Sequence, residues 1–231
     1  MCYIDLEPHL ELSALDGVTE EIIDGICRLR PMNLGVVGTQ EGLLDQSKCE
    51  LLTSSRTIQH PPGYGYYEKL LHTSFHIDSA FNGFAMSIRK PTSFASKHLR
   101  SECSDTEYTP HFPRLLAFAD TLPFSQYGRV HVYFNLPGMA GSPHRDWPHR
   151  VAFREHFIHF NPLRKPFYVL SKEGNKTYVE TRASLFRGDD YHGVDASPRT
   201  RFSFRIDGIF RDDFARRAGV NRLWEKNSSP D

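Results

Sequence analysis

The sequence lacks the features that mark nucleic-acid-binding and membrane proteins. Its 28 Lys and Arg residues balance 28 Asp and Glu residues, so no net positive charge attracts phosphate backbones or anionic lipid. No apolar run approaches the roughly 18 residues of a membrane-spanning helix, and the acidic start from Met1 to Leu12 has no apolar signal core. Composition therefore predicts a cytoplasmic protein with no nucleic-acid partner and no membrane partner.

Neither metal-binding cysteine spacing nor internal repeats occur in the sequence. The four cysteines show no C-x-x-C spacing, which excludes a zinc knuckle and a dithiol redox site and predicts free thiols. No repeat, low-complexity block or linker divides the 231 residues. The chain is therefore expected to form one globular domain with a substantial core.

Aromatic residues, proline and glycine are plentiful, and this favours short strands joined by turns. Aromatics make up 13% of the chain, with 15 Pro and 16 Gly. Polar and apolar residues alternate from Arg129 to Leu136, the period of a strand with two different faces. Further strands are predicted at Phe157 to Phe160, Phe167 to Leu170, Lys176 to Phe186 and Arg201 to Ile209. The fold is expected to be mainly β, an antiparallel sandwich with flanking helices.

Helices are expected near both ends and in the middle of the chain. Helical spacing of apolar residues predicts one over Val18 to Leu29, capped by Asp16 and ended by Pro31. Two shorter helices are predicted at Pro113 to Thr121 and Arg211 to Ala218. The loop from His60 to Tyr67, rich in proline, glycine and tyrosine, is either a surface connector or a cover that closes over substrate.

Three His-x-Asp/Glu triplets are candidates for metal ligands: His9 to Glu11, His76 to Asp78 and His144 to Asp146. Chance placement of 12 histidines and 28 acidic residues in 231 positions yields roughly 1.5 such triplets, so the bare pattern is weak. Only His144 to Asp146 follows a predicted strand and a turn, which would place both side chains at the mouth of a barrel. This triplet is therefore the favoured one.

The favoured triplet has a suitable sequel in His192, which precedes the predicted strand Arg201 to Ile209. In that strand Arg201, Ser203 and Arg205 share one face. Two histidines and one carboxylate on one side of an iron leave adjacent positions open for a chelating co-substrate and dioxygen. An inward arginine suits a dicarboxylate, because its planar fork pairs bidentately with a carboxylate.

These residues resemble the Fe(II)/2-oxoglutarate-dependent oxygenases. Within them, Ser142 to Asp146, Phe157 to Leu163 and His192 to Asp207 are similar to the aspartyl/asparaginyl β-hydroxylase-like group, which includes bacterial proline hydroxylases. The resemblance covers about Pro113 to Phe210. It implies a double-stranded β-helix (jelly roll, cupin-like) core, with residues 1–112 as an N-terminal helix, loops and supporting strands and residues 211–231 as a C-terminal helix and tail. The segment from Gly188 to Tyr191 departs from the longer apolar strand expected before His192.

The resemblance also implies roles for single residues. His144, Asp146 and His192 would bind Fe(II), and Arg201 would hold the distal carboxylate of 2-oxoglutarate. Ser203 could add a hydroxyl donor, and Arg205 is the second candidate for the role of Arg201. From its place in the strand alone, His159 is expected to be a hydrogen-bonded core histidine. The resemblance implies a second role for it, beside the carboxylate of 2-oxoglutarate. Asp146 argues against the related halogenases, which have a small residue at that position.

Other residues near these motifs are candidates for binding the primary substrate. His131, Tyr133 and Asn135 line the polar face of their strand, which either meets solvent or lines a barrel interior. Arg145, Arg150 and Arg154, with Trp147 among them, form either a solvated basic stretch or a contact for a substrate carboxylate. Tyr133, Asn135, Arg145 and Trp147 are the expected substrate-binding residues.

Three classes of function remain open at the level of sequence. The favoured one is a dioxygenase that uses iron, 2-oxoglutarate and dioxygen to hydroxylate a free amino acid or an amino-acid-derived small molecule, with desaturation or ring closure as possible variants. The second is a cupin-like isomerase or hydrolase that uses the metal without dioxygen. The third is a non-catalytic binding module with a structural, histidine-rich barrel.

Overall fold

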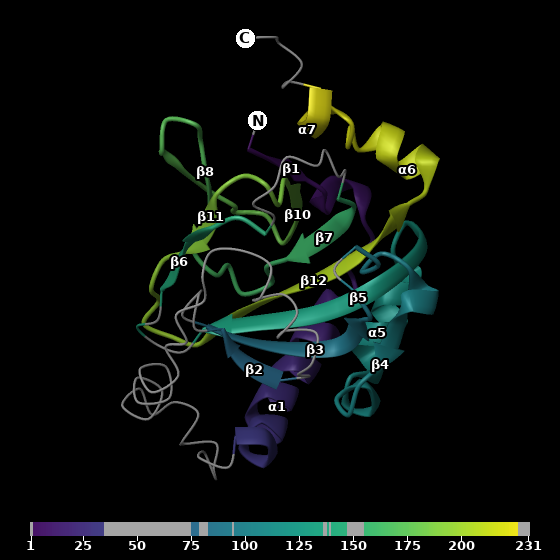
Figure 1. The fold of residues 1–231 in the computed structure, drawn as a ribbon, viewed down its shortest axis with the longest axis vertical. Helices are drawn as coiled ribbons and strands as arrows, with labels where there is room; N and C mark the ends of the chain where they lie inside the picture. The colour runs from purple at the N-terminus through teal and green to yellow at the C-terminus, as the bar shows by residue number, and fades with distance from the viewer. Residues whose placement is uncertain are drawn as a thin grey trace.

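The computed structural model describes residues 2–34, 75–78, 83–93, 95–135, 138, 140–146 and 155–225 (Figure 1). The predicted cover loop, residues 60–67, lies outside the described residues, as do Trp147, Arg150 and Arg154. Within the described part of the chain, no helix combines the length and the apolar character that a membrane span requires.

Strands dominate the fold and form two antiparallel sheets. The larger, eight-stranded sheet has the order β1 (Tyr3–Asp5), β10 (Ala183–Phe186), β7 (Phe157–Phe160), β12 (Arg201–Phe210), β5 (Phe124–Asn135), β3 (Gly83–Pro91) and β2 (Phe75–Asp78), and β4 (Cys103–Asp105) pairs with β3. The smaller, four-stranded sheet has the order β6 (Gly141–His144), β11 (His192–Val194), β8 (Phe167–Leu170) and β9 (Lys176–Tyr178).

The path from β5 to β12 defines a double-stranded β-helix, or jelly roll. The chain passes from one sheet to the other at each step, except that β8 and β9 are neighbours within the smaller sheet. Two four-stranded arrays result, β10-β7-β12-β5 and β6-β11-β8-β9. The prediction of a mainly β fold with a jelly-roll core and flanking helices is therefore confirmed.

Two helices, α1 (Leu15–Leu34) and α5 (Pro113–Thr121), pack on one face of the larger sheet (Figure 1). Phe118 of α5 meets Phe160 edge to face at a centroid distance of 5.3 Å, and Phe160 stacks on Phe204 of β12 at 4.6 Å. The alternate residues of β12 point to the opposite face and toward the smaller sheet. The smaller elements are η1 (Glu7–His9), η2 (Arg100–Glu102), η3 (Thr109–His111), α6 (Asp212–Arg217) and α7 (Arg222–Glu225).

Several predicted elements differ from the structure in their bounds. Helix α1 begins at Leu15 and runs through Pro31, so Asp16 lies in its first turn and Pro31 does not end it. Pro31 has no N–H to donate to the carbonyl four residues earlier, and the helix continues past this missing bond. The predicted strand Lys176 to Phe186 is two strands in different sheets, β9 and β10, because the chain crosses between the sheets after Tyr178.

Candidate metal site

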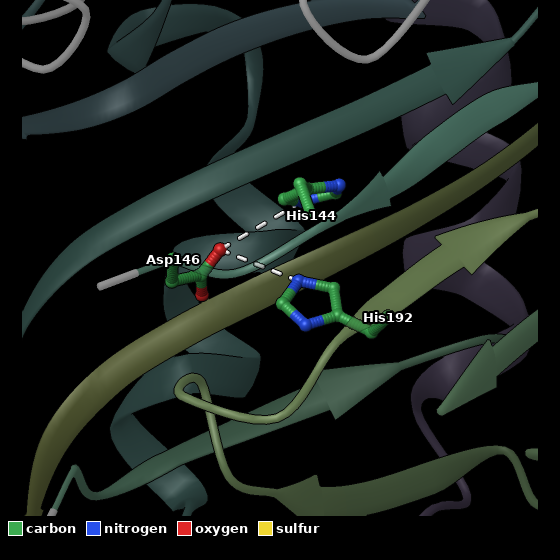
Figure 2. Close-up of side chains that lie close together, drawn as sticks. All are labelled: His144, Asp146 and His192. Carbon is green, nitrogen blue, oxygen red and sulfur yellow. Dashed lines mark ion pairs between the residues drawn. The ribbon is translucent and has the colours of Figure 1, made fainter. Parts of the chain in front are cut away.

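Strand pairing brings two histidines together. In the register of β6 and β11, His144 lies directly opposite His192, and their rings meet edge to face at a centroid distance of 4.4 Å. Asp146 follows two residues after His144, and its Oδ1 lies 3.3 Å from Nε2 of His192 and 3.9 Å from Nε2 of His144 (Figure 2). One potential ligand atom from each of the three residues lies within 4.8 Å of the others. Among the described residues, this is the group suited to hold a metal ion.

The loop before β11 fixes two members of this group. Nδ1 of His192 lies 2.9 Å from the carbonyl oxygen of Asp190. Because a carbonyl only accepts, Nδ1 donates to it, and the ring is held with Nε2 turned toward Asp146 as the nitrogen that a metal would bind. The carbonyl of Gly188 accepts the N–H of Asp146 at 2.8 Å. A Cβ at Gly188 would collide with the carboxylate of Glu155. The glycine therefore lets the segment from Gly188 to Tyr191, which departs from the expected apolar strand, approach the site closely.

Asp146 is held as a carboxylate. Burial alone would raise its pKa, but the neighbouring His192 and the Arg205 guanidinium outweigh burial and hold the pKa well below its usual value. Nη1 of Arg205 donates to Oδ2 of Asp146 at 2.5 Å. Asp146 therefore presents the charged form that a divalent metal binds, with Oδ1 toward the histidines and Oδ2 toward the arginine.

A buried cluster of charges extends from Arg205 away from the histidines. Arg205 donates through Nε and Nη2 to Oδ1 of Asp207, at 2.9 Å and 2.8 Å, and lies 3.3 Å from Glu155. Asp207 also accepts from Arg129 at 2.6 Å, and Lys97 forms an ion pair with Glu155. Counted with Asp146, three cations face three carboxylates. Of the members of this cluster, the sequence singles out only Arg205, as the second candidate for the role of Arg201. Period-two alternation extends to Arg129 and Asp207, whereas Lys97 and Glu155 lie outside any strand and carry no such signal.

The other residues expected to bind 2-oxoglutarate lie on the strand next to these charges. Arg201 is half-buried at the start of β12, opposite Asn135, and its Nη1 donates to the carbonyl of Thr200 at 3.4 Å. Ser203 is buried opposite Tyr133. Among the described residues, Arg201 forms no ion pair with a carboxylate, whereas Arg205 contacts three. The two candidate arginines are therefore in different electrostatic situations.

The polar face of β5 is mostly buried. His131 and Asn135 are buried, and Tyr133 is half-buried. Burial raises the pKa of Tyr133 to about 12, against the opposing effect of Arg129 and Arg205. Of the two expectations for this face, a solvated surface is wrong.

His159 lies in the same interior, among aromatic rings. Its ring is 4.6 Å from that of Phe167 and 5.6 Å from that of Phe186, and its Nδ1 is 3.4 Å from the hydroxyl of Ser184. Burial, reinforced by the charges of Lys165 and Arg205, lowers the pKa of His159 to about 3. His159 is therefore a neutral imidazole within the barrel.

The remaining predicted residues are less constrained. Arg145 is exposed, and its guanidinium lies 4.1 Å from the ring centroid of Tyr191. Trp147 lies outside the described residues. The other two triplets are elsewhere in the fold: His9 is in η1, and His76 is in β2, an edge strand paired with β3.

Comparison with known proteins gives weak similarities of fold. No family model and no curated protein matches the chain. A prolyl-4-hydroxylase from Pseudomonas putida has 13% identity and a TM-score of 0.33, over 73% of this chain and 89% of that one. A prolyl hydroxylase from Trichoplax adhaerens, solved with a hypoxia-inducible-factor peptide, has 11% identity and a TM-score of 0.38, over 86% and 94%.

A cupin 2 conserved barrel protein from Salinispora arenicola has 11% identity and a TM-score of 0.30, over 64% of this chain and 89% of that one. The structural neighbours thus include prolyl hydroxylases, a member of the 2-oxoglutarate–Fe(II) oxygenase family from Burkholderia pseudomallei (13% identity, TM-score 0.38, over 63% of this chain and 79% of that one) and a cupin. At this level of similarity, the function has to be inferred from the side chains of the site.

Proposed function

We propose that the protein is an Fe(II)/2-oxoglutarate-dependent dioxygenase that hydroxylates a free amino acid or an amino-acid-derived small molecule. The observation that carries the proposal is the convergence of His144, Asp146 and His192 within 4.8 Å inside a jelly roll. In this proposal residues 1–231 form one oxygenase domain, with residues 113–210 as its metal-binding core.

The three side chains suit iron chemically. Imidazole nitrogen and carboxylate oxygen are the ligands of the two-histidine, one-carboxylate iron site. The contact of His192 with the Asp190 carbonyl leaves Nε2 available, and the ion pair with Arg205 keeps Asp146 charged. Iron, when bound together with 2-oxoglutarate and dioxygen, supplies the oxidation of an unactivated C–H bond.

Arg201 is the proposed partner of the distal carboxylate of 2-oxoglutarate. Its charge is not committed to a described carboxylate, whereas Arg205 is paired with Asp146, Glu155 and Asp207. Ser203, on the same face of β12, would add a hydroxyl donor. His159 and Arg205 would border the co-substrate, His159 as a neutral hydrogen-bonding group and Arg205 as part of the surrounding charge.

The primary substrate is proposed to meet the polar interior and the exposed edge near the triplet. Tyr133 and Asn135 are opposite Ser203 and Arg201 and offer the donors and acceptors that an amino acid requires. Arg145 and Trp147, which flank Asp146 in the chain, would contact the substrate from outside, with Arg145 facing its carboxylate.

Succinate formation from 2-oxoglutarate tests the proposal directly. The Fe(II)-loaded protein is screened with a panel of free amino acids, and one of them should stimulate succinate release. His144→Ala, Asp146→Ala and His192→Ala should each abolish release and weaken Fe(II) binding, since each removes one of three ligands. The matched control is His76→Ala, which alters the same kind of triplet in β2 and should retain both.

Two outcomes would favour the other classes of function. Metal binding without consumption of 2-oxoglutarate would indicate a cupin-like isomerase or hydrolase. Absence of metal binding would indicate a non-catalytic module. Loss of metal in His76→Ala with retention in His144→Ala would move the site to the other triplet.

The role of Arg201 is tested with two chelators of different length. 2-Oxoglutarate has a distal carboxylate, and oxalate has none. Arg201→Ala should weaken binding of 2-oxoglutarate to the metal-loaded protein by about 2 kcal/mol, or roughly 30-fold, through loss of a charge-assisted pair. Binding of oxalate should be unchanged. Equal weakening of both chelators would remove Arg201 from the distal position.

A further inference from the structure

The contacts of Arg205 have a consequence for Asp146 beyond keeping its carboxylate charged. It is 3% exposed, and its side chain reaches three carboxylates from three different segments of the chain: Asp146, Glu155 and Asp207. A guanidinium paired with a metal-binding carboxylate adds a positive charge beside the metal. Such an arrangement opposes metal binding electrostatically and therefore calls for a compensating role.

Contacts other than the one with Asp146 hold the guanidinium of Arg205 in place. Asp207 receives both Nε and Nη2, Glu155 lies beside Nη2, and the ring of Phe157 lies 3.6 Å from the guanidinium carbon. Asp207 and Glu155 are shared with Arg129 and Lys97, so Asp146 is the third carboxylate that the three cations need. Nη1 remains, and it is aimed at Oδ2 of Asp146 at 2.5 Å.

The effect on Asp146 is to separate the roles of its two oxygens. Oδ2 is occupied by Arg205, while Oδ1 is the oxygen 3.3 Å from His192 and 3.9 Å from His144. The backbone N–H of Asp146 is held at the same time by the Gly188 carbonyl at 2.8 Å. The carboxylate can therefore not turn both oxygens toward the histidines without breaking its pair with Arg205.

We infer that Arg205 is a positioning residue that restricts Asp146 to one ligand oxygen and so keeps room on the metal for a chelating co-substrate. This inference rests on the proposed function, because it concerns the same metal site. Without Arg205, the second oxygen of Asp146 is free to join the first and occupy a position that the chelator needs. The arginine thus favours chelation at the expense of metal affinity.

The test separates metal binding from chelator binding. The double variant Arg205→Gln/Glu155→Gln removes one cation and one carboxylate together, so that Lys97 and Arg129 still balance Asp146 and Asp207. The matched control is Arg217→Gln/Asp213→Asn, which removes an exposed pair of the same type with a separation of 3.9 Å. Calorimetric titration with Mn²⁺, and then of the Mn²⁺-loaded protein with oxalate and with 2-oxoglutarate, gives the affinities.

The double variant should bind Mn²⁺ as tightly as the wild type or more tightly, and should bind both chelators more weakly by about 10-fold or more. Equal weakening for oxalate and 2-oxoglutarate distinguishes this role from that of Arg201. Arg205→Lys, which retains the charge, should show the same pattern with a smaller loss of chelator affinity. This variant provides the test if the double variant does not fold. The control should match the wild type.

Other results overturn the inference. Unchanged chelator affinity in both Arg205 variants, with Mn²⁺ bound more tightly, would mean that Arg205 only compensates Asp146 in the metal-free protein. Loss of Mn²⁺ binding with normal melting would mean that Arg205 sustains the metal itself. Failure of the wild type to bind Mn²⁺ or oxalate would overturn the proposed function, and the inference with it.

Discussion

The two faces of β12 are both buried, but different interactions stabilise them. Phe202, Phe204 and Ile206 on one face are at most 1% exposed and pack under the helices, while Arg205 and Asp207 on the other are 3% and 0% exposed. The apolar face is stabilised by removal of apolar area from water, an effect that is proportional to the area buried and has no preferred direction. The polar face depends on each charge finding its partner. One face of β12 should therefore tolerate substitution by other apolar residues, whereas the other should be destabilised by loss of any single charge.

Of the substitutions on the two faces of β12, removal of Asp207 should have the largest effect on the free energy of unfolding. Asp207 accepts from Arg129 at 2.6 Å and from Arg205 at 2.9 Å, and it is fully buried. Asp207→Ala leaves two buried guanidiniums short of a partner, so the free energy of unfolding should fall by about 3–5 kcal/mol. Urea denaturation of the metal-free protein measures this loss.

The control for Asp207 is an aspartate whose ion pair is exposed. Asp213 lies 3.9 Å from Arg217, and Asp213→Ala should change stability by less than about 1 kcal/mol. If Asp207→Ala also loses less than about 1 kcal/mol, the buried charges have other means of compensation, and the two faces of β12 are equally tolerant.

As the pH falls, the protein should lose stability through its buried histidines at a higher pH than through protonation of its carboxylates. Burial lowers the pKa of His159 to about 3 and that of His98 to about 4, from 6.5. Below pH 6.5 the unfolded chain therefore binds protons that the folded chain does not, and stability decreases as pH falls. Between pH 6 and pH 4.5 the loss should approach about 2 kcal/mol for each histidine.

His159→Gln isolates one of these two contributions. Urea unfolding across this pH window should show a shallower slope for the variant than for the wild type, by about 1.4 kcal/mol per pH unit. An identical slope in His159→Gln and the wild type would mean that the folded barrel accepts a proton at His159.

Alternation along the strands predicted most of the jelly roll. The bounds of β7 and β8 and of helix α5 agree with the predicted ones, because each has a sharp pattern ended by a proline or a polar turn. The proximity of His144, Asp146 and His192 was expected from the triplet and its sequel. The partition of the chain between sheets was not, since β9 and β10 read as one strand in sequence and only their partners separate them.

The charge cluster shows where sequence reasoning stops. Alternation places Arg205 and Asp207 on the face of Arg201, but it cannot say which arginine is already paired. That distinction depends on Glu155 and Lys97, which reach the site from segments without a periodic pattern. Charge pairing between segments far apart in the chain leaves no local signal, because each residue alone resembles an ordinary surface charge.

The smallest effect is expected on the apolar face. Phe204 stacks on Phe160 at 4.6 Å and is fully buried. Phe204→Leu retains most of the apolar volume, so the free energy of unfolding should fall by only about 1 kcal/mol. Mn²⁺ affinity should be unchanged, because the side chain points away from Arg205 and Asp146.

The two variants together decide whether the faces of β12 are independent. Phe204→Leu and Asp207→Ala change residues three positions apart on one strand, and only the latter touches the charges that hold Asp146. Mn²⁺ titration of both proteins is the measurement. If Phe204→Leu shifted Mn²⁺ affinity as much as Asp207→Ala does, packing against α5 would itself set the position of β12 in the barrel. The polar face would then depend on the apolar one, and the metal site would be as sensitive to core volume as to charge.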